Sequence, residues 1–182
     1  MCLLERLTVC CALVAVACAP ATTATAADEP HFGHPVTQAD IAAWDISIGP
    51  DGAGLPPGMG TVAQGEKVFA DKCQACHGEK GAGTPNDRLV GGAGTIAAGK
   101  TPVKTVGSYW PYATTLFDYV RRAMPWDRPK SLSDEEVYSV AAYVLYLNGV
   151  IGQDEVLDAQ TLPQVKMPNR DGFTPFPRWP PK

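Results

Sequence analysis

The residues best suited to chemistry are two cysteines and a histidine in the run Cys73-Gln74-Ala75-Cys76-His77. Two thiols separated by two residues can lie on one tight helical turn, where each can form a thioether with a vinyl group of a single porphyrin. The histidine that follows directly can place its imidazole beneath the porphyrin iron. The spacing therefore predicts one covalently bound haem c, with Cys73 and Cys76 as attachment points and His77 as an axial iron ligand.

Two other uses of a close cysteine pair fit this sequence less well. A zinc site needs further ligands, and the remaining histidines, His31 and His34, lie far upstream without a zinc-finger order. A thioredoxin-like dithiol belongs in a βαβ setting, which a helical chain does not offer. We expect His31 and His34 to be surface residues.

The second axial ligand can come from a methionine thioether. Met124, Met59 and Met167 are the candidates once the first residue is removed. Met124 is favoured because it stands in an extended Met-Pro turn between two predicted helices, where its flexible side chain can reach the far face of the ring. The alternative is that Met124 is an ordinary methionine of the hydrophobic core. Histidine plus methionine would close both axial positions of the iron and raise its reduction potential. A closed iron indicates an electron carrier rather than a haem enzyme.

Residues 1–27 have the outline of a secretory signal peptide. They contain an apolar run from Leu7 to Ala19, followed by a cleavage site at Ala24-Thr25-Ala26. The apolar run is about half the roughly 20 residues that a membrane-spanning helix needs. We therefore expect export to the periplasm without a membrane span, with lipidation at Cys18 as an alternative.

Removal of this leader decides what the cysteines can do. The sequence has six cysteines, and four of them, Cys2, Cys10, Cys11 and Cys18, leave with the leader. The mature chain keeps only the pair in the motif, so a disulfide-stapled scaffold is excluded. The formal net charge of −4 argues against nucleic acid as a partner.

Hydrophobic periodicity predicts a helix that ends in the cysteine motif. Val62, Gly65, Phe69 and Cys73 recur at spacings of three and four, which puts them on one helical face. A glycine-rich loop over 78–99 follows, and its small residues can pass close to a flat cofactor.

Two further helices are predicted downstream. One covers about 114–123 and stops before Met124-Pro125, because the residue before a proline is pushed away from helical backbone angles. The other begins at the capping box formed by Ser133 and Glu136 and ends at the Asn148-Gly149 pair.

Proline and glycine are dense outside this helical part. We expect a domain over 61–150, an extended N-terminal arm over 28–60 and an extended, proline-rich C-terminal arm over 151–182. Large apolar side chains in the arms must be covered either by the domain itself or by a partner.

Residues 61–150 resemble the class I cytochrome c family in Gly65, Phe69, the C-x-x-C-H motif, the Pro85-Asn86 turn, Met124-Pro125 and the final helix. The resemblance implies an all-α class I cytochrome c fold in which Gly65 and Phe69 cross the final helix near Tyr143 and Val144. It also implies that the carbonyl of Pro85 accepts a hydrogen bond from the second ring nitrogen of His77.

Three longer stretches, 41–60, 104–138 and 162–173, are similar to the cytochrome subunit of sulfane dehydrogenase, the SoxD-like family. In that family the cytochrome pairs with a molybdenum-cofactor subunit related to sulfite oxidases. The resemblance implies an electron-transfer subunit, not itself an enzyme, that serves periplasmic sulfur and thiosulfate oxidation and passes electrons to a downstream soluble cytochrome c. Some members carry two haem domains, whereas this chain has one motif. A sulfite dehydrogenase cytochrome subunit and a free periplasmic electron shuttle are the alternatives.

The same resemblance suggests roles for aromatic residues. It implies that the arms wrap the molybdenum subunit through Trp44, Phe173, Phe176 and Trp179, while wrapping of the chain's own domain is the alternative. Haem-pocket or propionate contacts are expected for Trp110, Tyr112 and Trp126. Arg121 and Arg122 are expected to be solvated charges, with a propionate or a partner as the alternative.

Overall fold

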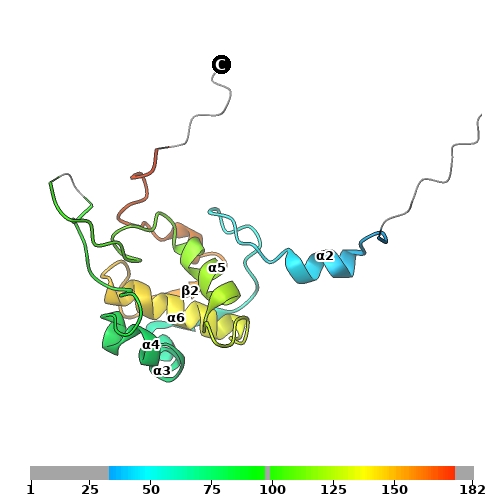
Figure 1. The fold of residues 1–182 in the computed structure, drawn as a ribbon, viewed down its shortest axis with the longest axis horizontal. Coiled ribbons are helices and arrows are strands. Elements are labelled where there is room, and N and C mark those ends of the chain that lie inside the picture. The colour runs from blue at the N-terminus through cyan, green and yellow to red at the C-terminus, as the bar shows by residue number, and fades with distance from the viewer. Residues whose placement is uncertain (1–32, 97–98, 175–182) are drawn as a thin grey trace, which may run out of the picture. The chain divides into compact units, whose positions relative to one another are not determined.

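The computed structural model describes residues 33–96 and 99–174. The expected leader, His31, Phe176 and Trp179 lie outside the described residues. From Ala39 onward the chain forms one compact unit. Its helices pack around α6, with α3 and α5 both in contact with that helix (Figure 1).

Helix α3, Val62–Lys72, begins at a capping box in which Thr61 is the N-cap and Gln64 reaches back to the Thr61 amide. Its buried residues are Val62, Gly65 and Phe69, which confirms the predicted apolar face. The capping box satisfies backbone amides that the first turn would otherwise leave unpaired. The helix therefore has a fixed start and a fixed inward face.

Helix α6, Asp134–Leu147, forms the centre of the unit. Its predicted capping box is present: the Ser133 hydroxyl accepts from the Glu136 amide at 3.2 Å, and the Glu136 carboxylate accepts from the Ser133 amide at 3.0 Å. Gly149 follows the C-cap residue of this helix, and its φ of +67° is the left-handed conformation common after a helix end. Residues 137–145 are all buried, because other elements cover the helix on several sides.

The crossing of α3 and α6 depends on a residue without a side chain. A Cβ at Gly65 would collide with the backbone carbonyl of Ser139 in α6. One turn further along, the rings of Phe69 and Tyr143 pack with centroids 5.4 Å apart. The expected crossing near Tyr143 is therefore confirmed, and the two helices approach closely because Gly65 allows it.

Helix α5, Ala113–Ala123, ends where the proline rule predicts. Met124 has extended backbone angles (φ −120°, ψ 148°) and donates its amide to the Val120 carbonyl as the helix C-cap. The helix buries Leu116 and Phe117 against the core, where Phe117 meets Tyr138 of α6 at a centroid distance of 4.4 Å. The all-α prediction is confirmed.

Two three-residue strands add a small antiparallel ribbon to the helical fold. Strand β1, Met59–Thr61, pairs with β2, Val156–Asp158, so that Gly60 lies opposite Leu157. Leu157 is 1% exposed, whereas Met59 and Val156 are exposed on the outer face. The ribbon joins the segment before α3 to the C-terminal arm.

The N-terminal arm is bound to its own domain from residue 46 onward. The Ile48 amide donates to Oδ1 of the buried Asp118 at 3.0 Å, and the Tyr138 hydroxyl donates to the Pro56 carbonyl at 2.9 Å. Ile48 itself is buried. Upstream, helix α2, Gln38–Trp44, has no buried residue.

The C-terminal arm also packs on the domain as far as the structure describes it. After β2 it forms the short 3₁₀ helix η2, Leu162–Gln164, and buries Leu162 and Met167 in the common core. The Asn169 side-chain amide donates to the Tyr109 carbonyl at 2.7 Å, and the ring of Phe173 packs edge-on against Tyr109. The arms were expected to wrap either a partner or the chain's own domain. Residues 46–58 and 156–173 pack on their own domain.

Candidate functional site

The two cysteines and the histidine lie on one short helical turn. Cys73 caps the end of α3, and α4, Gln74–His77, follows directly. The amides of Cys76 and His77 both donate to the Cys73 carbonyl, at 3.1 and 3.0 Å. This tight turn holds the two thiols and the imidazole together at one end of α3.

The two thiols are free and differ in environment. Cys73 is half-buried and Cys76 is exposed, with no disulfide between them. Burial raises the pKa of the Cys73 thiol to about 11, so this side chain stays protonated at neutral pH. Among the described residues, no group of three or more His, Cys, Asp or Glu side chains is placed to hold a metal ion.

The ring of His77 is oriented by a backbone carbonyl. Its Nδ1 lies 2.8 Å from the carbonyl oxygen of Asp87, so Nδ1 carries the proton and donates it. This leaves the lone pair of Nε2 available for a metal. A histidine ligand is commonly held in this way by a second hydrogen bond on its other nitrogen.

The acceptor of this bond corrects the expectation for Pro85. The Thr84 amide donates to the Asn86 carbonyl at 2.8 Å, which closes a tight turn with the exposed Pro85 at its apex. The Asn86 amide donates to the Cys76 carbonyl at 2.9 Å and so holds the end of this turn against α4. The carbonyl that reaches the imidazole is therefore that of Asp87, two positions later than the resemblance implied.

Glycine is required where the chain leaves the motif. Gly78 has a φ of +75°, and a Cβ there would come within 2.6 Å of the Gly83 carbonyl oxygen. The Gly83 amide in turn donates to the His77 carbonyl at 2.8 Å. Gly78 thus lets the loop fold back on the motif and bring Asp87 beneath the histidine.

The three candidate methionines occupy different environments. Met59 is 60% exposed on strand β1, and Met167 is 3% exposed within the hydrophobic core. Met124 is half-buried in the extended turn after α5. Of the three, only Met124 is neither packed into the core nor displayed on the outer ribbon.

The donor set fits a haem c. It consists of two closely spaced thiols and an imidazole whose Nε2 is free. Soft sulfur and imidazole donors suit iron in a porphyrin. Cys73, Cys76 and His77 would hold the group, and Met124 stays the predicted second axial donor.

The charged residues at the end of α5 are paired within the chain. Arg121 Nε donates to Asp134 at 3.0 Å, and Arg122 forms two hydrogen bonds to Asp118. Asp118 is the residue that sequence reasoning missed, because an acid on a helix carries no signal that it will also bind the Ile48 amide 70 residues away. Arg122 is exposed, as expected, although it is paired with Asp118, whereas Arg121 is half-buried in its pair with Asp134.

The three aromatic residues expected near the haem separate into two groups. Trp110 and Tyr112 are half-buried: Trp110 packs edge-on against Tyr119 with centroids 5.7 Å apart, and the Arg170 guanidinium lies 4.4 Å from the Tyr112 ring centre. Trp126 differs, because 83% of its surface is exposed. His34 is exposed, as expected.

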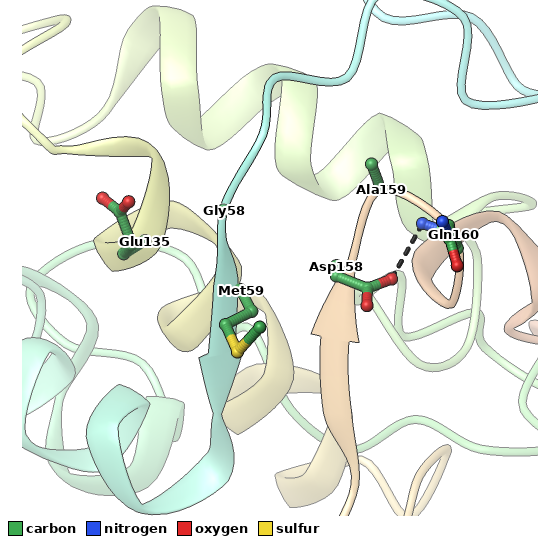
Figure 2. A pocket seen from close by; sticks show the side chains of 6 residues that line it. All are labelled: Gly58, Met59, Glu135, Asp158, Ala159 and Gln160. Carbon is green, nitrogen blue, oxygen red and sulfur yellow. Dashed lines mark hydrogen bonds between the residues drawn. The ribbon is translucent and has the colours of Figure 1, made fainter.

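A shallow pocket lies away from the cysteine motif, beside the β-ribbon. Figure 2 shows Met59 on β1 and Asp158 at the end of β2 flanking it, with Glu135 at the start of α6. Gly58, Ala159 and Gln160 complete its lining, and the Asp158 carboxylate accepts from the Gln160 amide at 2.8 Å. Met59 is the one predicted site residue among those that line this pocket.

Among the described helices, none combines the length and the apolar character needed to cross a bilayer.

Comparison with known proteins gives consistent results. Residues 60–144 match the family described as cytochrome C oxidase, cbb3-type, subunit III. The chain is 42% identical to a chain in the crystal structure of the sulfane dehydrogenase SoxCD from Paracoccus pantotrophus, with a TM-score of 0.75. That match covers 81% of this chain and 73% of the other.

Two curated relatives are thiosulfate dehydrogenases. The protein from Psychrobacter arcticus is 32% identical over 106 residues, which are 56% of this chain and 32% of the relative. The protein from Stutzerimonas stutzeri is 30% identical over 91 residues, which are 49% of this chain and 28% of the relative. The matched part thus spans about a third of the length of these relatives.

Proposed function

We propose that this chain, which belongs to the class I c-type cytochromes of the SoxD-like kind, is the electron-transfer subunit of a molybdenum-dependent sulfane dehydrogenase. The observation that carries the proposal is its 42% identity, over 81% of its length, to a chain of sulfane dehydrogenase SoxCD. In this role it accepts single electrons from a molybdenum-cofactor subunit and passes them to a downstream soluble cytochrome c. The sulfur substrate reacts on the partner, so this chain is not itself the catalyst.

The proposed site holds one haem c, attached through Cys73 and Cys76 and ligated by His77 and Met124. When bound, the group supplies a reversible one-electron couple. The hydrogen bond from His77 Nδ1 to the Asp87 carbonyl supports this assignment, because it fixes the ring and raises the basicity of Nε2. The core position of Met167 and the outer position of Met59 favour Met124 as the second ligand. Two protein ligands leave no open position for a substrate.

A permanent protein partner is supported by helix α2. This helix has seven residues and buries none of them, and Ile41 and Trp44 are 42% and 83% exposed. Isolated helices shorter than about 12 residues are marginal in water. The segment that follows α2 is anchored to the domain at Ile48, so a fixed point lies four residues beyond the C-terminal end of this helix. We propose that the molybdenum subunit covers the Ile41 and Trp44 side of α2.

The cellular compartment of the chain follows from the same proposal. Residues 1–27 would act as a signal peptide and direct the chain to the periplasm, where the pair Cys73 and Cys76 is free to take up haem.

The axial ligands can be tested by optical spectroscopy of the ferric, haem-loaded protein. We expect a low-spin spectrum with a sulfur-to-iron charge-transfer band that disappears in Met124→Ala and persists in Met59→Ala, which serves as the matched control. A high-spin spectrum of the native protein would contradict the closed iron site. A band that survives in Met124→Ala would assign the ligand to another residue.

The partner can be tested by isolation from the native host and by hydrogen exchange. We expect the protein to co-purify with a molybdenum subunit and the amides of α2 to become protected in that complex. Isolation as a monomer, without molybdenum, would favour the free electron shuttle instead.

A further inference from the structure

We propose that Arg121 is a positioning residue for the second axial ligand, because it bridges α5 and α6 and so keeps the segment that carries Met124 closed. This segment, residues 124–133, joins the end of α5 to the start of α6 and is called the Met124 loop below (Figure 1). The inference rests on the proposed function, in which Met124 binds the haem iron.

Arg121 connects the two ends of the Met124 loop. It lies in the last turn of α5, and Asp134 is the first residue of α6. Arg121 Nε donates to Asp134 Oδ1 at 3.0 Å, which is a hydrogen bond between two opposite charges. The two side chains are 23% and 34% exposed, so water and salt screen this pair less than a fully exposed pair. The bond therefore closes the loop at its base.

The restraints within the Met124 loop are weaker. Pro125 is buried and Leu132 packs against the core, but residues 126–131 are all exposed. The Arg128 amide donates to the Pro125 carbonyl at 3.0 Å, and the Arg128 guanidinium lies 3.7 Å from Asp127, with both side chains at least 70% exposed. An exposed pair of this kind adds little stability. Exposed loops open at a lower free energy than the core, so a bond between the loop ends has a large effect on opening.

Arg121 also contacts the N-terminal arm. Its Nη1 donates to the Ile46 carbonyl at 3.5 Å, at the base of the Met124 loop. Further along the loop, the Lys130 ammonium lies 5.7 Å from the centre of the Trp44 ring. The arm thus lies against the same loop, and Arg121 is the residue that contacts α5, α6 and the arm together.

Loop opening has a measurable consequence for ligand exchange. An added ligand such as imidazole can bind to the ferric iron only after the Met124 thioether has left it. Its nitrogen then takes the place of the sulfur, and no electron is transferred. The apparent affinity for imidazole is therefore proportional to the fraction of molecules with an open loop. Loss of the Arg121 bridge should increase that fraction and raise the affinity by the same factor.

The test is a spectroscopic titration of the ferric, haem-loaded protein with imidazole, followed by the loss of the sulfur-to-iron charge-transfer band. We expect Arg121→Gln and Asp134→Asn each to raise the apparent affinity at least threefold. The double variant should raise it no further than the single variants, because both remove the same bond. Arg121→Lys keeps the charge and should stay within twofold of the native affinity.

Arg122→Gln is the matched control. Arg122 is the next residue of α5 and is also paired with an acid, but its partner Asp118 lies on the same helix and does not bridge the loop. Asp118 is 12% exposed, so Arg122→Gln should lower global stability in urea at least as far as Arg121→Gln. It should nevertheless leave the imidazole affinity within twofold of the native value.

Two results would overturn the proposal. One is a rise of less than threefold in both Arg121→Gln and Asp134→Asn, and the other is an equal rise in Arg122→Gln, which would trace the effect to general destabilisation. Failure of the proposed function looks different, because the native protein itself would then lack the charge-transfer band before any imidazole is added.

Discussion

The backbone amide of Ile48 donates a hydrogen bond to Oδ1 of Asp118 at 3.0 Å, across 70 residues of sequence. The same carboxylate accepts two hydrogen bonds from Arg122, so one buried acid links the N-terminal arm to α5. Because a buried carboxylate must keep its partners, this link fixes the N-terminal arm to α5 at Ile48. Upstream of it, α2 buries none of its residues, and the Lys130 ammonium lies 5.7 Å from the centre of the Trp44 ring.

Replacement of Asp118 by alanine should destabilise the protein by about 2–3 kcal/mol, because the Ile48 amide and the Arg122 guanidinium both lose their partner. Urea unfolding of the haem-loaded protein measures this loss. Asp118→Asn is the matched control: it keeps an acceptor for the amide but not the charge, and should cost about 1 kcal/mol. Equal stability of Asp118→Ala and the native protein would contradict this role for the carboxylate.

Replacement of Gly65 by alanine should disrupt the crossing of α3 and α6. The new methyl group would collide with the Ser139 backbone, which cannot move without distorting α6. We expect a loss of about 3 kcal/mol or more, or failure to fold, measured by thermal unfolding and haem content.

Gly152→Ala is the control for that experiment. The nearest atom to a Cβ at Gly152 is Glu155 Cγ at 3.7 Å, so this substitution should change stability by less than about 0.5 kcal/mol. A tolerated Gly65→Ala would mean that the two helices do not approach as closely as described.

The features predicted correctly from the sequence are those with local causes. The Ser133 and Glu136 capping box, the end of α5 before Pro125 and the apolar face of α3 each depend on residues within a few positions of one another. The cysteine turn is local in the same way, because both thiols and the imidazole lie within five residues. Periodicity and cap chemistry are sufficient to find such features.

The features that could not be predicted depend on contacts between distant segments. The β1 and β2 strands have three residues each, too few to give an alternating pattern, and they pair only because the C-terminal arm returns to the start of α3. The family resemblance implied the Pro85 carbonyl as the acceptor for His77, and the local sequence does not tell which carbonyl of a tight turn faces the ring. Burial of Met167 likewise required knowledge of the arm's path over the core.

Glu136 should make stability depend on pH in the acid range. The hydrogen bond from Lys72, then that from the Ser133 amide, holds the pKa of this carboxyl below its ordinary value of 4.5. The folded state therefore binds this proton less readily than the unfolded state, and the stabilisation is present at pH 7 and lost as the pH falls below about 4.5. Glu136→Gln should be less stable than the native protein at pH 7, by about 1 kcal/mol.

The difference in stability between Glu136→Gln and the native protein should disappear on acidification. Urea unfolding at several pH values between about 7 and 3 would measure it. Glu135→Gln, at the neighbouring exposed position, is the matched control and should leave the pH profile unchanged. A constant difference between Glu136→Gln and the native protein down to the lowest pH would rule out the ion pair with Lys72 as its source.

Tyr138 should make stability depend on pH in the alkaline range. Burial, followed by the charges of Asp134 and Asp158, raises the pKa of its hydroxyl from 10.0 to about 12, and the hydroxyl donates to the Pro56 carbonyl at 2.9 Å. Since the folded state retains this proton more strongly, its contribution is complete below about pH 10 and declines as the pH rises towards 12. Tyr138→Phe should lose about 1 kcal/mol at pH 7, because the hydrogen bond that holds the N-terminal arm is gone.

Between pH 10 and 12 the stability of Tyr138→Phe should fall less steeply than that of the native protein, so the two unfolding curves converge. Some decline persists in both, because burial also raises the pKa of Tyr143. Tyr146→Phe, at an exposed position on α6, is the control and should follow the native curve. Parallel alkaline curves for Tyr138→Phe and the native protein would contradict this prediction. They would mean that the Tyr138 hydroxyl ionises as readily in the folded state as in the unfolded state.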